Sequence, residues 1–314
     1  MLAHLRDAAA ARVLDGALGR APSGERLARI RRSPQFAGGR FRNVLPIRNH
    51  ATPATIAAWL FGGAARRPTR PIPVEHPPTA APASDDLRLT WLGHATVLVE
   101  IEGRRFLTDP VLLADRSGPG RFGMRRFFDA PLAPTTLPAL DAVIVTHDHY
   151  DHLGESTARA LAGRVPRWVT PLGVGAHLEA WGVPPDRITE LDWWEETRVA
   201  GVRLVCTPTR HFSGRAPWDA NQTLWAGWAV VGARRRLYVS GDSGMTPEFA
   251  AIGARLGPFD ATLIEIGAYS EGTDPLVDRA RRLLPAIDAF LRQSTDDHTG
   301  APDAWARLHA LVTA

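Results

Sequence analysis

The run His147-Asp148-His149-Tyr150-Asp151-His152 constrains this chain more than any other part of its sequence. It directly follows Ala142-Val-Ile-Val-Thr, a short apolar segment that predicts a buried strand. A loop that leaves the end of a strand can turn several side chains toward one point. Three imidazoles and a carboxylate so close together suit zinc, which favours nitrogen and oxygen ligands. The run therefore predicts a metal site, and a chance group of polar loop residues is the weaker interpretation.

Two further candidate ligands also follow predicted strands. His211 comes after the strand candidate that starts at Leu204, and Asp242 comes after the one that starts at Leu237. Side chains just past several strand ends can line one edge of a sheet. The sequence thus predicts six metal ligands, which are His147, His149, Asp151, His152, His211 and Asp242. Asp151 and Asp242 are also the candidate catalytic residues.

Other polar residues are candidates for the surroundings of this site. Asp109 either orients a ligand histidine or forms a turn before Pro110. His94 either lines the pocket or makes a hydrogen bond within the core. Tyr150, between two ligands, could face the substrate. One of the two arginines near His211, Arg210 or Arg215, is expected to meet a phosphate.

The length and composition predict one large α/β domain with appendages. The chain has 314 residues, of which 45% are hydrophobic, so it can bury one sizeable core. We expect an N-terminal helical and extended arm over residues 1–85, a catalytic domain over 86–270 and a divergent helical tail over 271–314. Within the arm, residues 1–32 predict a helix. Many strands with a few helices between them predict two sheets that are covered by helices.

The charged residues argue against a nucleic-acid partner. All 37 basic residues are arginine, and the formal net charge is +4. The arginines are scattered, whereas a nucleic-acid surface gathers them on one face. No secretory signal is recognisable, and no apolar run approaches the ~20 residues of a membrane-spanning helix. Cys206 is the single cysteine, so no intramolecular disulfide can form. We expect a soluble, cytoplasmic protein with Cys206 in its core.

The order His-x-His-x-Asp-His, a distant His and then Gly-Asp resembles the metallo-β-lactamase superfamily. The flanking segments are similar to one branch, the N-acylphosphatidylethanolamine-hydrolysing phospholipase D group and its bacterial relatives. The similarity extends from residue 33 to about residue 270. The segments that carry it are Trp91–Thr96, Thr108–Pro110, Glu190–Glu195, Thr209–Arg215, Asn221–Trp225 and Ile266–Tyr269.

This resemblance implies an αββα sandwich, in which two mixed sheets lie between outer helices, with two zinc ions at one edge. It assigns His147, His149 and His211 to the first ion, Asp151 and His152 to the second, and Asp242 to a bridging position. Two such ions activate water for attack without a Ser or Cys nucleophile. The implied substrate is a small molecule or lipid, with a phosphodiester bond of a phospholipid-like molecule as the reacting group.

One ligand of that branch is missing. The branch has a histidine in a His-Trp-Gly-Thr-Phe type segment near its C-terminus, where this chain has Leu284–Phe290. His298 and His309 are the histidines that remain downstream. Three explanations stay open: the second ion is held by the remaining ligands and water, one ion alone is bound, or the tail has been altered.

Three other functional classes follow from the same residues. A lactonase or other ester hydrolase shares the metal cluster, and fold alone does not choose between these substrates. A pseudoenzyme would explain the missing ligand. A nuclease is disfavoured by the scattered arginines. Peripheral membrane contact is a further hypothesis, since Trp59, Leu60 and Phe61 form a short apolar patch that either meets a bilayer or caps the core.

Overall fold

A computed structural model describes residues 16–47, 70–113, 116–117, 124–216 and 218–265. The chain divides into two compact units, and residues 16–47 and 71–264 belong to the first. The second unit consists of residues 49–70 and 265–314, of which only Arg70 and Glu265 are described. The predictions for Trp59, Leu60 and Phe61, for the tail and for His298 and His309 therefore lie outside the described residues.

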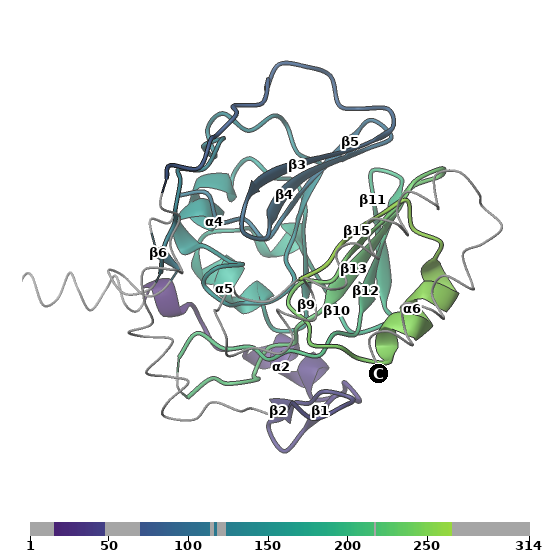
Figure 1. Cartoon of the computed structure of the whole chain (residues 1–314). Helices are drawn as coiled ribbons and strands as arrows, with labels where there is room; N and C mark the ends of the chain where they lie inside the picture. The colour runs from purple at the N-terminus through teal and green to yellow at the C-terminus, as the bar shows by residue number, and fades with distance from the viewer. Residues whose placement is uncertain (1–15, 48–69, 114–115, 118–123, 217, 266–314) are drawn as a thin grey trace, which may run out of the picture. The chain divides into compact units, whose positions relative to one another are not determined.

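The first sheet of this unit has six strands in the order β10-β9-β8-β5-β4-β3 (Figure 1). Strands β3, β4 and β5 form an antiparallel meander, and β5, β8, β9 and β10 run parallel. The sheet is therefore mixed. Its strands are β3 (Leu87–Gly93), β4 (Thr96–Ile101), β5 (Arg104–Thr108), β8 (Ala142–Ile144), β9 (Trp168–Pro171) and β10 (Ile188–Leu191).

The second sheet has five strands in chain order, from β11 to β15. The pairs from β11 to β14 are antiparallel, and β15 joins β14 in parallel, so this sheet is also mixed. Its strands are β11 (Glu196–Val199), β12 (Val202–Thr207), β13 (Gly227–Val231), β14 (Arg236–Val239) and β15 (Ala261–Leu263). Two small hairpins, β1 (Phe36–Ala37) with β2 (Arg40–Phe41) and β6 (Arg116–Ser117) with β7 (Met124–Arg125), lie outside both sheets.

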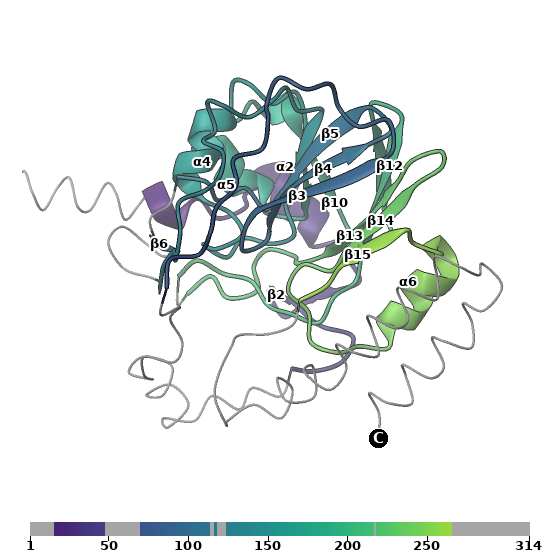
Figure 2. The ribbon, with the colours of Figure 1, turned by 45° about the horizontal axis from the view of Figure 1, so that its top comes forward.

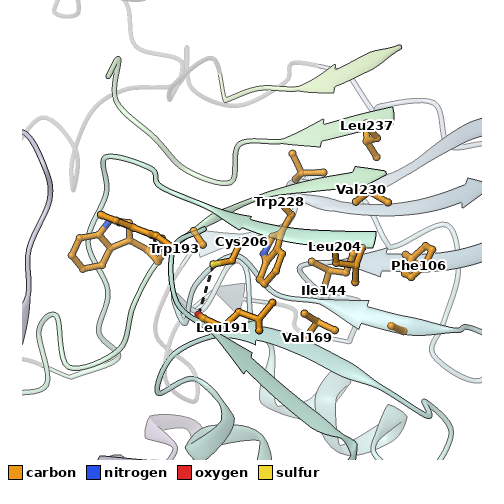
Figure 3. Packing of buried hydrophobic residues seen from close by; sticks show 14 of the residues in the cluster. Phe106, Ile144, Val169, Leu191, Trp193, Leu204, Cys206, Trp228, Val230 and Leu237 are labelled. Atoms are coloured by element: carbon orange, nitrogen blue, oxygen red, sulfur yellow. Dashed lines mark hydrogen bonds between the residues drawn. The ribbon is translucent and has the colours of Figure 1, made fainter. Parts of the chain in front are cut away.

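The main hydrophobic core lies between the two sheets, as the close view in Figure 3 shows. Phe106, Ile144 and Val169 of the first sheet face Leu204 and other apolar residues of the second. Such an interior drives folding because apolar surface leaves water there. Cys206 is fully buried in this core, and its thiol lies 3.7 Å from the Leu191 carbonyl oxygen, as predicted for a small core residue.

Helices cover the outer faces of both sheets (Figures 1 and 2). Helices α4 (Glu155–Leu161) and α5 (Gly175–Ala180) pack on the first sheet, and α6 (Glu248–Leu256) packs on the second. Strand β4 is buried along its whole length because its sheet is covered on both faces. The layers are therefore helix, sheet, sheet and helix, which confirms the predicted αββα sandwich.

The described part of the N-terminal arm packs against the sheets. Its helix α2 (Gly24–Ile30) is shorter than the predicted helix over residues 1–32, of which residues 1–15 are not described. Residues 19–23 are not helical. Gly19 adopts a φ of 76°, and Pro22 disfavours the helical conformation of the residue before it. Ile30 joins the core between the sheets, and Arg26 pairs with Glu179 and Glu190. A short 3-10 helix, η2 (Pro185–Arg187), precedes β10.

No helix in the described part of the chain combines the length and the apolar character that crossing a bilayer requires.

Candidate metal centre

The six predicted ligands converge although they come from separate loops. The loop after β8 carries His147, His149, Asp151 and His152, whereas His211 follows β12 and Asp242 follows β14. Their ligand atoms form overlapping groups of three, and within each group these atoms lie within 4.8 Å of one another. The groups are His147-His149-His211, His94-Asp151-His152 and His147-His152-Asp242.

The first group consists of three imidazoles with short distances between their ring nitrogens. Nε2 of His147 lies 2.9 Å from Nδ1 of His149, and Nε2 of His211 lies 3.2 Å from the same atom. Two nitrogen ligands of one tetrahedral zinc ion lie about 3.3 Å apart when each Zn–N distance is about 2.05 Å. The spacing of this group therefore matches the spacing that one zinc ion requires.

Burial keeps the first group neutral. It lowers the pKa of His147 and of His149, and it lowers the pKa of His211 to about 3. Burial disfavours the charged imidazolium form of these rings. At neutral pH these rings consequently offer lone pairs, which is the form of histidine that binds a metal.

His152 belongs to both of the other groups, and 1% of its side chain is exposed. Its Nδ1 lies 2.8 Å from Oδ2 of Asp109. Its Nε2 lies 3.1 Å from Oδ1 of Asp242 without hydrogen-bond alignment, so this buried nitrogen has no hydrogen-bond partner among the described residues. Although burial opposes its charge, Asp109 and Asp242 raise the pKa of His152 well above its ordinary value.

Asp109 is positioned by strand β5 and adopts a φ of 40°, a conformation that Asp tolerates better than most residues. Its carboxylate accepts hydrogen bonds from the backbone amide of Thr146 at 2.7 Å and from the Thr146 hydroxyl at 2.8 Å. These contacts leave Oδ2 facing Nδ1 of His152. The structure therefore places Asp109 beside the ligand histidine that it can orient.

Both carboxylates of the centre are ionised. Burial opposes ionisation of Asp242, but His152 and His211 lower its pKa. The same opposition is overcome at Asp151, where a hydrogen bond from His94 and the proximity of His152 hold the pKa well below its ordinary range. The centre therefore presents two negative charges beside the neutral imidazoles of His147, His149 and His211.

These donors fit divalent metal ions. A buried imidazole nitrogen without a partner is costly, since its hydration is lost and nothing replaces it. A metal ion at Nε2 of His152 removes that cost, while Nδ1 donates to Asp109. Nitrogen and carboxylate donors suit zinc and neighbouring transition metals rather than calcium or magnesium.

Sequence reasoning missed a role for Asp148, the first of the two acids in the motif. This buried carboxylate points away from the ligands and accepts hydrogen bonds from the Thr223 hydroxyl at 2.7 Å and the Gly214 amide at 2.8 Å. Nδ1 of His177 accepts from the Arg20 amide, so Nε2 carries the proton and lies 3.3 Å from Asp148. Asp148 therefore joins the ligand loop to the loop that follows His211, a role that its place between two ligands did not indicate.

Of Arg210 and Arg215, one of which we expect to meet a phosphate, Arg215 has its guanidinium buried within the protein. Arg215 is 4% exposed and donates hydrogen bonds to the carbonyl oxygens of Ala17, Asp148 and Leu153. Its guanidinium lies 4.1 Å from the ring centre of Tyr150. Burial of a cation is tolerated when carbonyl oxygens and aromatic faces surround it. Arg215 thus stabilises the ligand loop from behind.

Tyr150 and Arg210 also contact the protein itself. The Tyr150 hydroxyl donates to the Arg215 carbonyl oxygen at 2.6 Å. Arg210 donates to the carbonyl oxygens of Pro46 at 2.6 Å and Met245 at 3.2 Å. Both side chains therefore connect loops around the centre.

The N-terminal arm holds His211 in place. Asn43 accepts a hydrogen bond from the His211 amide at 3.0 Å and donates one to its carbonyl oxygen at 2.7 Å. The indole of Trp225 donates to the same Asn43 oxygen at 3.1 Å. A residue about 170 positions upstream thus fixes the backbone of a ligand, which no local pattern in the sequence revealed.

Exposed apolar side chains lie beside His211 and on the segments that bind the neighbouring Arg210. Phe212 is 47% exposed, and its ring centre lies 4.5 Å from that of His211. Val44, Leu45 and Ile47 are exposed on the arm, on either side of the Pro46 carbonyl that binds Arg210. Met245, which is 54% exposed, also contacts Arg210 through its carbonyl. We call Val44, Leu45, Ile47, Phe212 and Met245 the apolar rim.

Comparison with known proteins gives a family match. A family model described as a beta-lactamase superfamily domain matches residues 104–293, which is more than half of the chain. The matched residues include the ligand loop, His211 and Asp242.

Curated relatives are similar over part of their length. An uncharacterised protein of Mycobacterium tuberculosis is 46% identical over 76% of this chain and 65% of its own length. The N-acyl-phosphatidylethanolamine-hydrolyzing phospholipase D 1 of Caenorhabditis elegans is 42% identical over 57% of this chain and 53% of its own. A UPF0173 metal-dependent hydrolase of Hyperthermus butylicus is 30% identical over 57% and 71%. The chain thus spans between half and two thirds of the first two relatives.

Among solved structures, an isothiocyanate hydrolase from Delia radicum gut bacteria is 25% identical. The match covers 63% of this chain and 80% of the chain of that hydrolase, with a TM-score of 0.47.

Proposed function

Because the chain belongs to the metallo-β-lactamase superfamily, we propose that it is a metal-dependent hydrolase with a dinuclear zinc centre. We further propose that it cleaves a phosphodiester bond of a phospholipid-like substrate. The observation that carries the metal proposal is the buried Nε2 of His152, which lacks a hydrogen-bond partner among the described residues and faces the carboxylate of Asp242.

The residues of the centre would divide the work by their charge and burial. His147, His149 and His211 would hold one ion, and Asp151 and His152 the other, with Asp242 between them. When bound, divalent ions supply a Lewis acid and lower the pKa of water to about 7. Asp151 and Asp242 would offset part of the positive charge, and Asp109 would keep the ring of His152 in one orientation.

Two observations support a lipid substrate. The C. elegans relative carries the name of an N-acyl-phosphatidylethanolamine-hydrolysing enzyme, and so does a Saccharomyces cerevisiae relative that is 31% identical. The apolar rim offers exposed hydrophobic surface beside the ligand His211. The transfer of acyl chains from water to such a surface lowers the free energy. We accordingly propose that the apolar rim contacts a membrane surface.

The test is zinc-dependent release of phosphatidic acid from N-acylphosphatidylethanolamine in mixed micelles, measured by mass spectrometry. The full chain is compared with and without chelator treatment and after addition of two equivalents of zinc. We expect product from the zinc-loaded protein and a fall of at least 100-fold in the chelator-treated protein and in His147→Ala.

The matched control is His76→Ala, which removes an exposed histidine that contacts the Pro131 carbonyl and leaves the centre intact. Turnover of lactones with intact lipid would replace the phosphodiester proposal by the ester-hydrolase one. Failure to bind any zinc would overturn the hydrolase proposal and favour a pseudoenzyme.

A further inference from the structure

We propose that His94 is a ligand of the second metal position, in place of the C-terminal histidine that the sequence lacks. This inference rests on the proposed function, since it takes the second group of donors as a metal site. In the described part of the chain, His94 is the one residue outside the six predicted ligands whose donor atom falls in a ligand group, the group with Asp151 and His152.

The backbone turns His94 toward the centre. Strands β3 and β4 pair Gly93 with Thr96, so His94 is the first residue of a two-residue loop. It adopts a φ of 50°, which is uncommon for a residue with a side chain. The Trp91 indole donates to the His94 carbonyl oxygen at 2.7 Å and so holds this conformation.

The residue before His94 has a backbone conformation that residues with a side chain rarely adopt. Gly93 adopts a φ of 114°, and a Cβ there would lie 2.2 Å from Nη2 of Arg126. Arg126 donates to the Leu92 carbonyl oxygen at 2.9 Å and thereby occupies the space beside the loop. The chain therefore turns at Gly93 through a conformation that favours glycine, and His94 follows directly after this turn.

The contacts of His94 are those of a third donor. Its Nε2 lies 3.2 Å from Oδ2 of Asp151, and its ring centre lies 5.0 Å from that of His152. The loop is joined to Asp109, the residue that contacts His152, because the Thr96 hydroxyl donates to the Asp109 carbonyl oxygen at 2.6 Å. Two imidazoles and a carboxylate are thus brought together, and such a set of three protein ligands is common for zinc.

A simple ion pair explains less. The side chains of His94 and Asp151 are 54% and 32% exposed, and pairs with such exposure contribute little to stability. The positive φ of His94 costs stability, and a weak surface ion pair would not compensate for this cost. An ion pair between His94 and Asp151 also leaves Nε2 of His152 without a hydrogen bond, whereas a metal shared by the three residues would bind this atom.

The test introduces a thiolate at position 94. The full-length apo variant His94→Cys is titrated with Co²⁺, and absorption in the near ultraviolet is followed, where a thiolate bound to cobalt gives a charge-transfer band. We expect the band to appear with the second equivalent of cobalt. Wild type and His76→Cys, with exposed position 76 as the matched site, should not show it. Absence of the band in His94→Cys would overturn the inference.

Metal content gives an independent readout. Wild type should retain two equivalents of zinc after dialysis, whereas His94→Ala should retain one and bind the second at least 10-fold more weakly. The double variant His298→Ala, His309→Ala should keep both. A loss of the second equivalent in this tail variant, with no loss in His94→Ala, would assign the place to the tail.

The two proposals fail in different ways. A wild-type chain with one equivalent of zinc and measurable hydrolysis would end the assignment of His94 and leave the hydrolase proposal standing. A chain without bound metal would end both. The midpoint of thermal unfolding, compared between the apo forms, shows that each variant is folded.

Discussion

Nδ1 of His152 and Oδ2 of Asp109 lie 2.8 Å apart, and both side chains are 1% exposed. A carboxylate in this position fixes which ring nitrogen carries the proton and leaves the other free to bind a metal. The same carboxylate is held by two hydrogen bonds from Thr146, so it cannot rotate away from His152. The pair therefore connects the strand ends of the first sheet to the chemistry of the centre.

Asp109→Asn is expected to weaken zinc binding 10- to 100-fold, because the neutral amide orients His152 less firmly. Competition with a coloured chelator measures this change. Asp85→Asn is the matched control, since Asp85 is exposed and lies outside the centre. Unchanged affinity in Asp109→Asn would show that Asp109 has no role in orienting the ligand.

Asp148 makes stability depend on pH. Burial opposes its ionisation, but the hydrogen bond from His177 and the nearby charges hold the pKa of Asp148 well below its ordinary value. A carboxyl with a lowered folded-state pKa contributes stability above its unfolded pKa of about 3.9, and this contribution is lost as the pH falls through the folded value.

Asp148→Asn should therefore lower the free energy of unfolding by on the order of 2 kcal/mol at pH 7, and the difference from wild type should shrink below about pH 4. Urea unfolding of the apo forms between pH 3 and pH 7 measures both effects. A difference that stays constant over this range would contradict the ionised state of Asp148.

Arg215→Met should destabilise the apo protein by about 3 kcal/mol, because it leaves the buried carbonyl oxygens of Ala17, Asp148 and Leu153 without donors. Arg198→Met, at a position in β11 where the guanidinium contacts the Gly201 carbonyl at the surface, should change stability by less than about 0.5 kcal/mol. Equal effects of the two substitutions in urea unfolding would refute the role assigned to Arg215.

Cys206 is expected to be inert in the folded protein. Burial raises the pKa of its thiol well above the ordinary value, and the thiolate is the reactive form. A thiol-specific chromogenic reagent should label no cysteine in native buffer and one per chain in concentrated urea. Arg198→Cys, with its exposed position, should react at once in native buffer. Rapid labelling of native wild type would contradict the burial of Cys206.

The sequence by itself determined the ligand loop and the character of the fold. His147, His149, Asp151 and His152 are recognisable because they are close in sequence and follow an apolar strand. His211 and Asp242 are recognisable because they follow strands as well. Strand periodicity and the resemblance to a family were enough to predict two helix-covered sheets, since this pattern reflects which faces leave water.

Tertiary structure alone decided the surroundings of the ligands. Asp148 and Arg215 look like ligand-loop and phosphate-binding residues in the sequence, yet both are buried where they join loops together. His94 and Asn43 lie far from the ligand loop along the chain, and strand pairing and arm packing bring them to the centre. Three-dimensional packing decides which polar groups bind one another across such distances. A local sequence pattern therefore does not predict these partners.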